Sequence, residues 1–365
     1  MKRPAQPSLF ASQGKTCSPA TNKSYSCIEV APRPAGDMSA TDISAAAVDF
    51  PEYCLLSDDG VSVATSRQGA CRIVGVTFTT YRIQNGATVT TGVLYQDAFL
   101  LTYSNQNSDF FAYQVGLASV GSSWGDATRA TMTGTTRADG LCVTAGSSFP
   151  VQAVYPPRTM RIGESGYTTT ATAPGASGIC TTWWDVTYTV AGYTPASISL
   201  GMNDIRCDNA VGGYLQNPVR VGCVVPWYPA PVYYDSSRNP TLADHVRQAQ
   251  ASGLPGGTVT APLYRSTDAA VERTNRRLAC GNPPSIPGKN CDEYPLATTY
   301  NGLSAGGSLR SFPGCNISAP SGSGPLGASA CMIAEGDNHA QGGIMSGFYY
   351  WERVLDWDPF VVTVL

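Results

Sequence analysis

Between about residues 70 and 200, apolar and polar positions alternate along the chain with a period of two. β-Branched and aromatic residues alternate with Thr, Ser or Gln, and clusters of Gly, Asn and Asp separate the segments. The clearest segments are 71–83, 87–104, 109–120 and 180–193. Alternation of this kind predicts half-buried strands, and regularly spaced turn residues predict antiparallel connections. We therefore expect an antiparallel β-rich, sandwich-like domain over residues 55–205.

The pattern changes after about residue 205, where apolar positions recur at helical spacing. Helices are predicted at 241–253, 266–280 and 342–356, and a strand at 359–365. Residues 206–365 are thus expected to form a small α+β domain. Residues 1–54 are rich in Ser, Ala, Pro and Thr without a sustained period, which predicts an extended N-terminal arm. The predicted fold class of the whole chain is α+β.

Composition excludes several classes of protein. Only 13% of the 365 residues are charged while 42% are hydrophobic, which argues against a disordered chain or a coiled coil. No apolar run approaches the roughly 20 residues that span a bilayer, so no membrane span is expected. The net charge of −3 gives no basic footprint for nucleic acid. Any nucleic-acid partner would therefore be held weakly and in a salt-sensitive way.

Twelve cysteines, none in a CxxC pair, favour disulfides over zinc sites. Disulfides predict an oxidising compartment, and we expect a secreted, extracellular bacterial protein. The first fifteen residues begin basic but lack the apolar core of a secretory signal. Either the signal has been removed or the protein is delivered by another route.

Candidate chemistry is concentrated in two acidic segments, 291–302 and 331–343. The second is expected to be a strand that delivers a loop containing Glu335, Asp337, Asn338 and His339, before a helix that begins near Gly342. Carboxylate and amide oxygens suit Mg²⁺, Mn²⁺ or Ca²⁺ rather than zinc. A helix N-terminus favours an anion such as phosphate. Together these features predict metal-assisted hydrolysis of a phosphodiester, although the same residue pairs also occur in ordinary turns.

Three segments of the chain, two of them within the acidic segments above, carry a resemblance to a known family. CDEYPLATT (291–299), GDNHAQGG (336–343) and LADHVRQAQ (242–250) follow one another in an order and at spacings that resemble the secreted bacterial deoxyribonucleases of the NucA/NucB family. The resemblance covers about residues 205–365 and leaves the β-rich half without a counterpart. It implies a compact nuclease core with a ββα-metal-like active site, in which an acidic residue replaces the usual histidine base.

The resemblance also implies roles for individual residues. Asp292 is expected to be the general base, and Glu293 to bind the metal or orient a basic residue. His339 departs from the basic residue common in the family, and either contacts phosphate or faces solvent. The implied metal ligands for Mg²⁺ or Mn²⁺ are Asn338, Asp337 and Glu335. The implied substrate-binding residues are His245, Arg276, Arg277 and Gln341.

The sequence therefore predicts an extracellular, metal-dependent endonuclease that hydrolyses DNA with little sequence preference. The β-rich half suggests an alternative, a non-catalytic adhesion or carbohydrate-binding protein. A third hypothesis is a glycoside hydrolase using the Asp292 and Glu335 carboxylates. The metal, the preference for DNA or RNA, the oligomeric state and the role of the β-rich half stay open.

Overall fold

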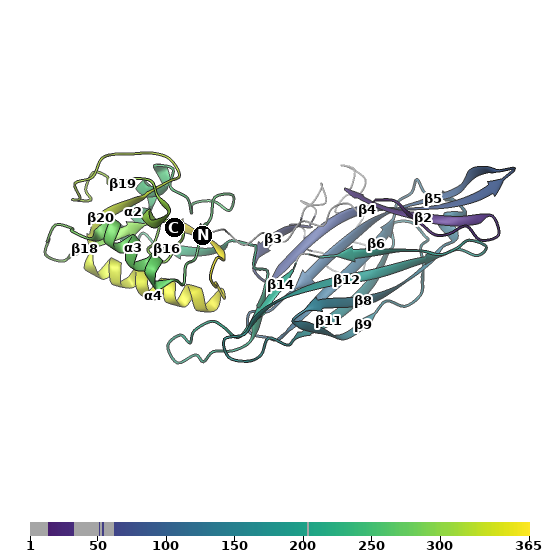
Figure 1. Cartoon of the computed structure of the whole chain (residues 1–365), viewed down its shortest axis with the longest axis horizontal. Coiled ribbons are helices and arrows are strands. Elements are labelled where there is room, and N and C mark those ends of the chain that lie inside the picture. Colours follow the sequence, from purple (N-terminus) through teal and green to yellow (C-terminus); the bar gives the residue numbers. More distant parts are fainter. Residues whose placement is uncertain (1–13, 33–50, 52, 55–61, 203) are drawn as a thin grey trace. The chain divides into compact units, whose positions relative to one another are not determined.

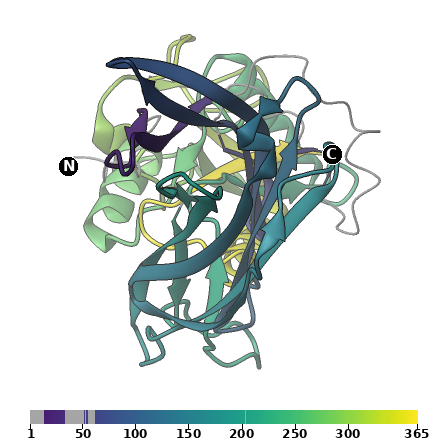
Figure 2. The same cartoon turned by 90° about the vertical axis from the view of Figure 1, so that its right-hand side faces the viewer.

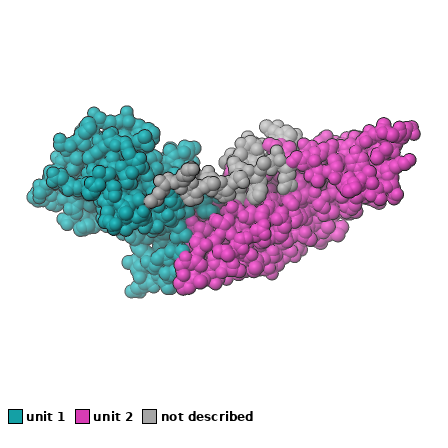
Figure 3. Space-filling view, in the orientation of Figure 1, with its two compact units in different colours: residues 1–4, 210–220, 226–365 teal, residues 5–209, 221–225 magenta. Residues whose placement is uncertain are grey.

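The computed structural model describes residues 14–32, 51, 53–54, 62–202 and 204–365, which divide into two compact units (Figures 1 and 3). The described part of unit 1 comprises Ala210–Arg220 and Pro226–Leu365. Unit 2 comprises the described residues up to Asn209, together with Val221–Val225.

Two curled antiparallel sheets form unit 2 (Figure 2). Among the described residues, the larger sheet has nine strands in the order β1-β2-β4-β5-β6-β11-β9, with β3 paired to β4 and β7 to β5. Its strands are β1 Thr16–Cys17, β2 Ser24–Pro32, β3 Val63–Ser66, β4 Gly69–Gln84, β5 Ala87–Tyr103, β6 Phe110–Ser119, β7 Trp124–Gly125, β9 Cys142–Ser148 and β11 Met160–Thr169.

The second sheet of unit 2 has six strands among the described residues, in the order β10-β8-β12-β14-β15, with β13 paired to β12. Its strands are β8 Thr131–Gly140, β10 Gln152–Ala153, β12 Ser177–Thr189, β13 Ala196–Gly201, β14 Ile205–Asp208 and β15 Gly222–Val224. A short 3₁₀ helix, Asp126–Arg129, follows β7.

Aromatic side chains hold the two sheets of unit 2 together. Phe78 of β4 stacks on Tyr188 of β12 with ring centroids 5.1 Å apart. The Tyr188 hydroxyl donates to Gln96 Oε1 of β5 at 2.6 Å, and the Tyr113 hydroxyl of β6 donates to the Leu200 carbonyl of β13 at 2.9 Å. Buried tyrosines normally require such partners. One face of each sheet therefore packs against the other, as the period-two alternation predicts.

The predicted N-terminal arm contributes strands where it is described. β1 and β2 form an antiparallel hairpin closed by the Cys17–Cys27 disulfide, and β2 pairs with β4 from Ser24 opposite Arg82 to Pro32 opposite Val74. Most of the remaining arm, 1–13 and 33–50, lies outside the described residues.

Unit 1 contains two small sheets and three α-helices within the described part of the chain. In the first sheet, β16 (Ala230–Tyr234) is parallel to β21 (Pro359–Val364), which is antiparallel to β17 (Leu263–Tyr264). In the second, β18 (Lys289–Tyr294) is antiparallel to β20 (Ala328–Ala334), which is parallel to β19 (Leu309–Arg310). The helices are α2 Pro240–Ala251, α3 Ala269–Cys280 and α4 Glu335–Trp351, with a 3₁₀ turn at Leu303–Ala305.

The core of unit 1 lies between these helices and sheets. Leu242 and Val246 of α2 pack with Tyr294 of β18, Ile333 of β20 and Phe360 of β21 in one buried cluster. The helices predicted at 241–253 and 266–280 are confirmed as α2 and α3, and the C-terminal strand is confirmed as β21.

The predicted α+β class is wrong for this chain. Strands account for 46% of the structure and helices for 15%, which describes a mainly β protein rather than a chain ending in a small α+β nuclease with a ββα-metal-like site. The physical reason is the small share of the chain that helices occupy. The helices α2, α3 and α4 have only 12, 12 and 17 residues, whereas sheets of nine and six strands make up the described part of unit 2.

Every cysteine is paired, which confirms the prediction of disulfides. The bonds join Cys17 to Cys27, Cys54 to Cys71, Cys142 to Cys180, Cys207 to Cys223, Cys280 to Cys291 and Cys315 to Cys331. Six disulfides are consistent with a secreted or extracellular protein. Among the described helices, none has the length and apolar character needed to cross a membrane.

Gly140 provides a test of the packing of unit 2. Its φ is +91°, and a Cβ atom there would lie 2.1 Å from the Ile179 carbonyl oxygen of β12. Gly140→Ala is therefore expected to lower the free energy of unfolding by about 1–3 kcal/mol. Guanidinium unfolding of the oxidised protein measures this loss. The control is Gly146→Ala, because Gly146 has an ordinary φ and open space at its Cβ position. Equal stability of the two variants would contradict the assignment.

Candidate functional site

A pocket of about 270 Å³ in unit 1 brings together several of the residues singled out by the sequence. Glu272 and Arg276 reach it from α3, Asp292 and Glu293 from β18, and Gln341 from α4; the rest of the lining is Leu296, Ala297, Thr298, Gly342, Met345, Ser346 and Tyr349. Side chains of successive strand residues point to opposite faces. Both carboxylates border the same pocket because β18 is an edge strand of its sheet.

His245 fixes the position of the Asp292 carboxylate through a buried hydrogen bond. Its Nδ1 lies 2.7 Å from Asp292 Oδ2, and its Nε2 lies 2.9 Å from Ser329 Oγ. An ionised carboxylate can only accept a hydrogen bond, so we assign the proton of this bond to Nδ1. His245 and Asp292 are 1% and 3% exposed, and Ser329 is fully buried. These contacts connect α2, β18 and β20 through one polar chain.

The order Ser329, His245, Asp292 is also that of a serine hydrolase triad. Ser329, however, has no exposed surface, and its Oγ also lies 3.3 Å from the Tyr294 carbonyl, to which it can donate. A nucleophile must reach the substrate, and this hydroxyl does not. Asp292 is the member of the chain that borders the pocket, so the arrangement presents a carboxylate rather than a serine.

Glu293 differs from Asp292 in its surroundings. Burial, together with the negative charge of Asp292, raises the pKa of the Glu293 carboxyl to about 7, although the Arg276 guanidinium acts in the opposite direction. Burial and the nearby Asp292 likewise raise the pKa of Tyr234, which lies in the adjoining core, well above its usual value. A strand residue with a pKa near neutrality, beside a second carboxylate in a pocket, is suited to proton transfer.

Arg276 supplies the positive charge of the pocket. Its guanidinium lies 3.0 Å from Glu272 Oε1, one helical turn earlier, and 3.9 Å from Glu293 Oε1. The Arg276 side chain is 64% exposed, so these ion pairs hold it in place only weakly. It is therefore able to turn toward an anionic group that enters the pocket.

Asp337 has a structural role that the sequence did not indicate. Its Oδ2 accepts hydrogen bonds from the Thr241 backbone N–H at 2.8 Å and the Thr241 hydroxyl at 2.6 Å. The first turn of a helix has unpaired N–H groups, and Asn239, at the N-cap position of α2, makes no side-chain bond to them. A carboxylate from α4 therefore caps α2.

The segment predicted as a metal-binding loop is the beginning of a helix. α4 starts at Glu335, seven residues before the expected start near Gly342. Four of the residues singled out by the sequence, Glu335, Asn338, His339 and Arg277, do not line the pocket. Glu335 and His339 are exposed on α4, Asn338 is half-buried on the same helix, and Arg277 is exposed on α3.

Asp337, one of the three implied metal ligands, is used by the N-terminus of α2. Within the described part of the chain no group of three or more His, Cys, Asp or Glu side chains is arranged to hold an ion. The metal site implied for Asn338, Asp337 and Glu335 stays a prediction. Asp292 and Glu335 are also not brought together as a glycoside hydrolase pair. Asp292 borders the pocket, whereas Glu335 is exposed at the start of α4 and does not line it.

Sequence reasoning missed three residues that shape the site. Ser329 lies in an apolar strand segment, and nothing in its neighbours signals a histidine partner. Glu272 lies in a charged helical segment typical of a solvent-exposed face, but it pairs with Arg276 and borders the pocket. Tyr349 also borders the pocket, and its hydroxyl lies 2.9 Å from Thr298 Oγ1.

Comparison with known proteins gives no family for the chain. No protein-family model and no curated protein matches it. One match among solved structures is a glycosyl hydrolase family 2 member from Bacteroides cellulosilyticus, with 10% identity, 50% of this chain and 28% of that chain covered, and a TM-score of 0.12. The chain spans about a quarter of that enzyme, and the low TM-score carries no argument about fold or activity.

The capping role of Asp337 is testable by stability. Asp337→Ala leaves the first N–H groups of α2 and the Thr241 hydroxyl without their acceptor, so the free energy of unfolding is expected to fall by about 2 kcal/mol. Glu335→Ala, on the exposed side of the same helix turn, serves as the control and should change stability little. Urea unfolding distinguishes them, and equal stability would rule out the cap.

Glu293 predicts a specific pH dependence of stability. Its pKa is about 7 in the folded protein and 4.5 as the ordinary value, so between these pH values the folded state binds the additional proton. Its contribution to stability is therefore retained at low pH and lost as the pH rises from about 4.5 to 7, by roughly 3 kcal/mol at most. Glu293→Gln should become more stable relative to the wild type across this range. A difference between the two proteins that is independent of pH would contradict the raised pKa.

Proposed function

We propose that unit 1 is a phosphodiester hydrolase that acts on DNA as an endonuclease. The observation that carries the proposal is the pocket in which Asp292, oriented by His245, adjoins the protonatable Glu293 and the Arg276 guanidinium. A base, an acid and a cation are the groups that hydrolysis of an anionic diester requires. The resemblance of the 291–299 and 336–343 segments to NucA/NucB nucleases supports DNA as the substrate.

The proposed reaction uses each group once. Asp292, as a carboxylate, takes a proton from a water molecule, and the resulting oxygen attacks phosphorus. Protonated Glu293 gives its proton to the oxygen of the bond that breaks, so that one strand end leaves as an alcohol and the other keeps the phosphate. Arg276 holds the negative charge on the non-bridging oxygens. His245 keeps Asp292 in position through its Nδ1–H bond.

The proposal places the protein outside the bacterial cell, where six disulfides persist. With one arginine in the pocket and a net charge of −3, we expect weak, salt-sensitive affinity and low sequence preference. The requirement for Mg²⁺ or Mn²⁺ comes from the family resemblance, and Asp337, one of the implied ligands, is bonded to Thr241 instead. It stays a prediction that a chelator tests.

The test is cleavage of supercoiled plasmid by the oxidised full-length chain, with Mg²⁺, with Mn²⁺ and with a chelator. Asp292→Asn keeps the size of the side chain but removes the base, so the rate is expected to fall by at least about 100-fold. The matched control is Asp244→Asn, the same change at an exposed position of α2.

The control should cleave plasmid at the wild-type rate, and circular dichroism should show that both variants keep the fold. Absence of cleavage by the oxidised wild type under every metal condition would refute the nuclease. Cleavage that survives Asp292→Asn unchanged would refute Asp292 as its base.

A further inference from the structure

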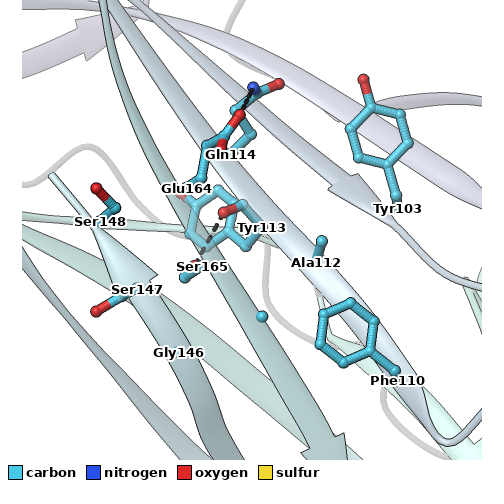
Figure 4. Close-up of a pocket in the computed structure, with 11 residues that line it drawn as sticks. Tyr103, Phe110, Ala112, Tyr113, Gln114, Gly146, Ser147, Ser148, Glu164 and Ser165 are labelled. Atoms are coloured by element: carbon cyan, nitrogen blue, oxygen red, sulfur yellow. Dashed lines mark hydrogen bonds between the residues drawn. The ribbon is translucent and has the colours of Figure 1, made fainter.

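Unit 2 carries an open trough of about 540 Å³ on the outer face of its larger sheet (Figure 4). It crosses β5, β6, β11 and β9, and none of the residues implied by the nuclease resemblance lies in it. It extends across three spacings between neighbouring strands, about 14 Å in the direction perpendicular to the strands. This extent is sufficient for an extended ligand.

A row of small residues forms the floor of the trough. Ala112 of β6 is paired with Gly166 of β11, and Gly166 is paired with Gly146 of β9. Gly146 has nothing within 4 Å of its Cβ position. Three adjacent strands thus present almost no side chain at the same register position, which lowers the sheet surface there.

Two aromatic rings border this floor. Tyr103 of β5, at the end of the same row and paired with Ala112, is 40% exposed, and Phe110 of β6 is 45% exposed. A Cβ atom on Gly166 would lie 2.4 Å from the Phe110 ring, so the glycine leaves room for the ring to lean over the floor. Figure 4 shows both rings on the same side of the trough. They offer flat apolar surfaces to a ligand.

The next row on the same face is polar. Gln114 of β6, Glu164 of β11 and Ser148 of β9 are paired with one another across the sheet. Gln114 Nε2 donates to Glu164 Oε1 at 3.1 Å. Gln114 is 8% exposed, and its Oε1 has no hydrogen-bond partner among the described residues. The Gln114 Oε1 atom is buried, whereas the Glu164 carboxylate and the Ser148 hydroxyl are exposed and face a ligand.

The charge of the trough lining restricts the class of ligand that can bind. The described lining contains the Glu164 carboxylate but no Lys, Arg or His, so a phosphate chain or another polyanion would be repelled. A ligand with flat C–H faces and several hydroxyl groups satisfies both the rings and the polar row. Pyranose sugars have this combination of surfaces, and an open trough accepts a chain of them.

We infer that this trough binds a neutral polysaccharide, with sugar rings against Tyr103 and Phe110 and sugar hydroxyls hydrogen-bonded to Glu164 and Ser148. This site is independent of the proposed nuclease pocket. It gives the β-rich unit a binding function of its own.

Affinity electrophoresis of the oxidised full-length chain tests the inference, in gels that contain hydroxyethylcellulose, glycol chitin, starch or, as the polyanion, polygalacturonate. At least one neutral polysaccharide should retard the wild type, and polygalacturonate should not. Tyr103→Ala removes a ring, and Gly146→Trp fills the floor at an unstrained position. Each is expected to weaken binding by about tenfold or more. Tyr95→Ala is the control, since Tyr95 is equally exposed on β5 but lies outside the trough.

Retardation by none of the neutral polysaccharides would overturn the inference, as would retardation that both trough variants retain. Preferential binding of polygalacturonate, or of a dT20 oligonucleotide in a Tyr103-dependent way, would overturn the choice of a neutral ligand. Asp292→Asn should bind polysaccharide as the wild type does. Failure of the nuclease proposal and failure of this one are therefore distinguishable.

Discussion

The buried hydrogen bond between His245 and Asp292 is the constraint on which the candidate site depends. Burying a carboxylate away from water costs several kcal/mol of folding free energy unless it is paired. The buried Asp292 therefore requires a hydrogen-bond donor. His245 is that donor, and its other nitrogen fixes Ser329 of the neighbouring strand. The disulfides reinforce the same strands, because Cys291 precedes Asp292 and Cys331 lies two residues after Ser329. Covalent bonds and polar contacts thus restrain β18 and β20 together.

Alternation along β18 gives two neighbouring carboxyl groups different chemistry. Asp292 points toward α2 and has a hydrogen-bond donor, whereas Glu293 points toward α3, where the Arg276 guanidinium lies 3.9 Å away. Burial and the neighbouring Asp292 charge raise the pKa of Glu293. The consequence is a carboxylate beside a carboxylic acid whose pKa is near 7, the separation of roles that acid–base catalysis uses. The family resemblance implies that Glu293 binds the metal or orients a basic residue, and Arg276 lies 3.9 Å from it; the raised pKa also suits the proton donor that we propose.

The sequence correctly predicted the features that depend on interactions between residues close together in the chain. The helices α2 and α3 follow their apolar spacing, and Asp292, Glu293, Arg276 and Gln341 do border one pocket. Contacts between distant segments decided the remainder. The sequence predicts a helix start near Gly342, yet α4 begins at Glu335, where Asp337 bonds to Thr241 almost a hundred residues earlier. The fold class failed for a different reason, since the three helices of unit 1 are short beside the many strands of unit 2.

The trough of unit 2 likewise depends on contacts between distant segments that the sequence does not reveal. Ala112, Gly166 and Gly146 give no signal in the sequence, and they form a floor only because the registers of β6, β11 and β9 align them. A slip of one residue would turn the buried Tyr113 and Ser165 outward and send the small residues into the core. The hydrogen bond from the Tyr113 hydroxyl to Leu200 of the opposite sheet opposes such a slip. The contact that holds the two sheets together therefore also maintains the surface on the far side, so the core and the proposed binding face depend on one register.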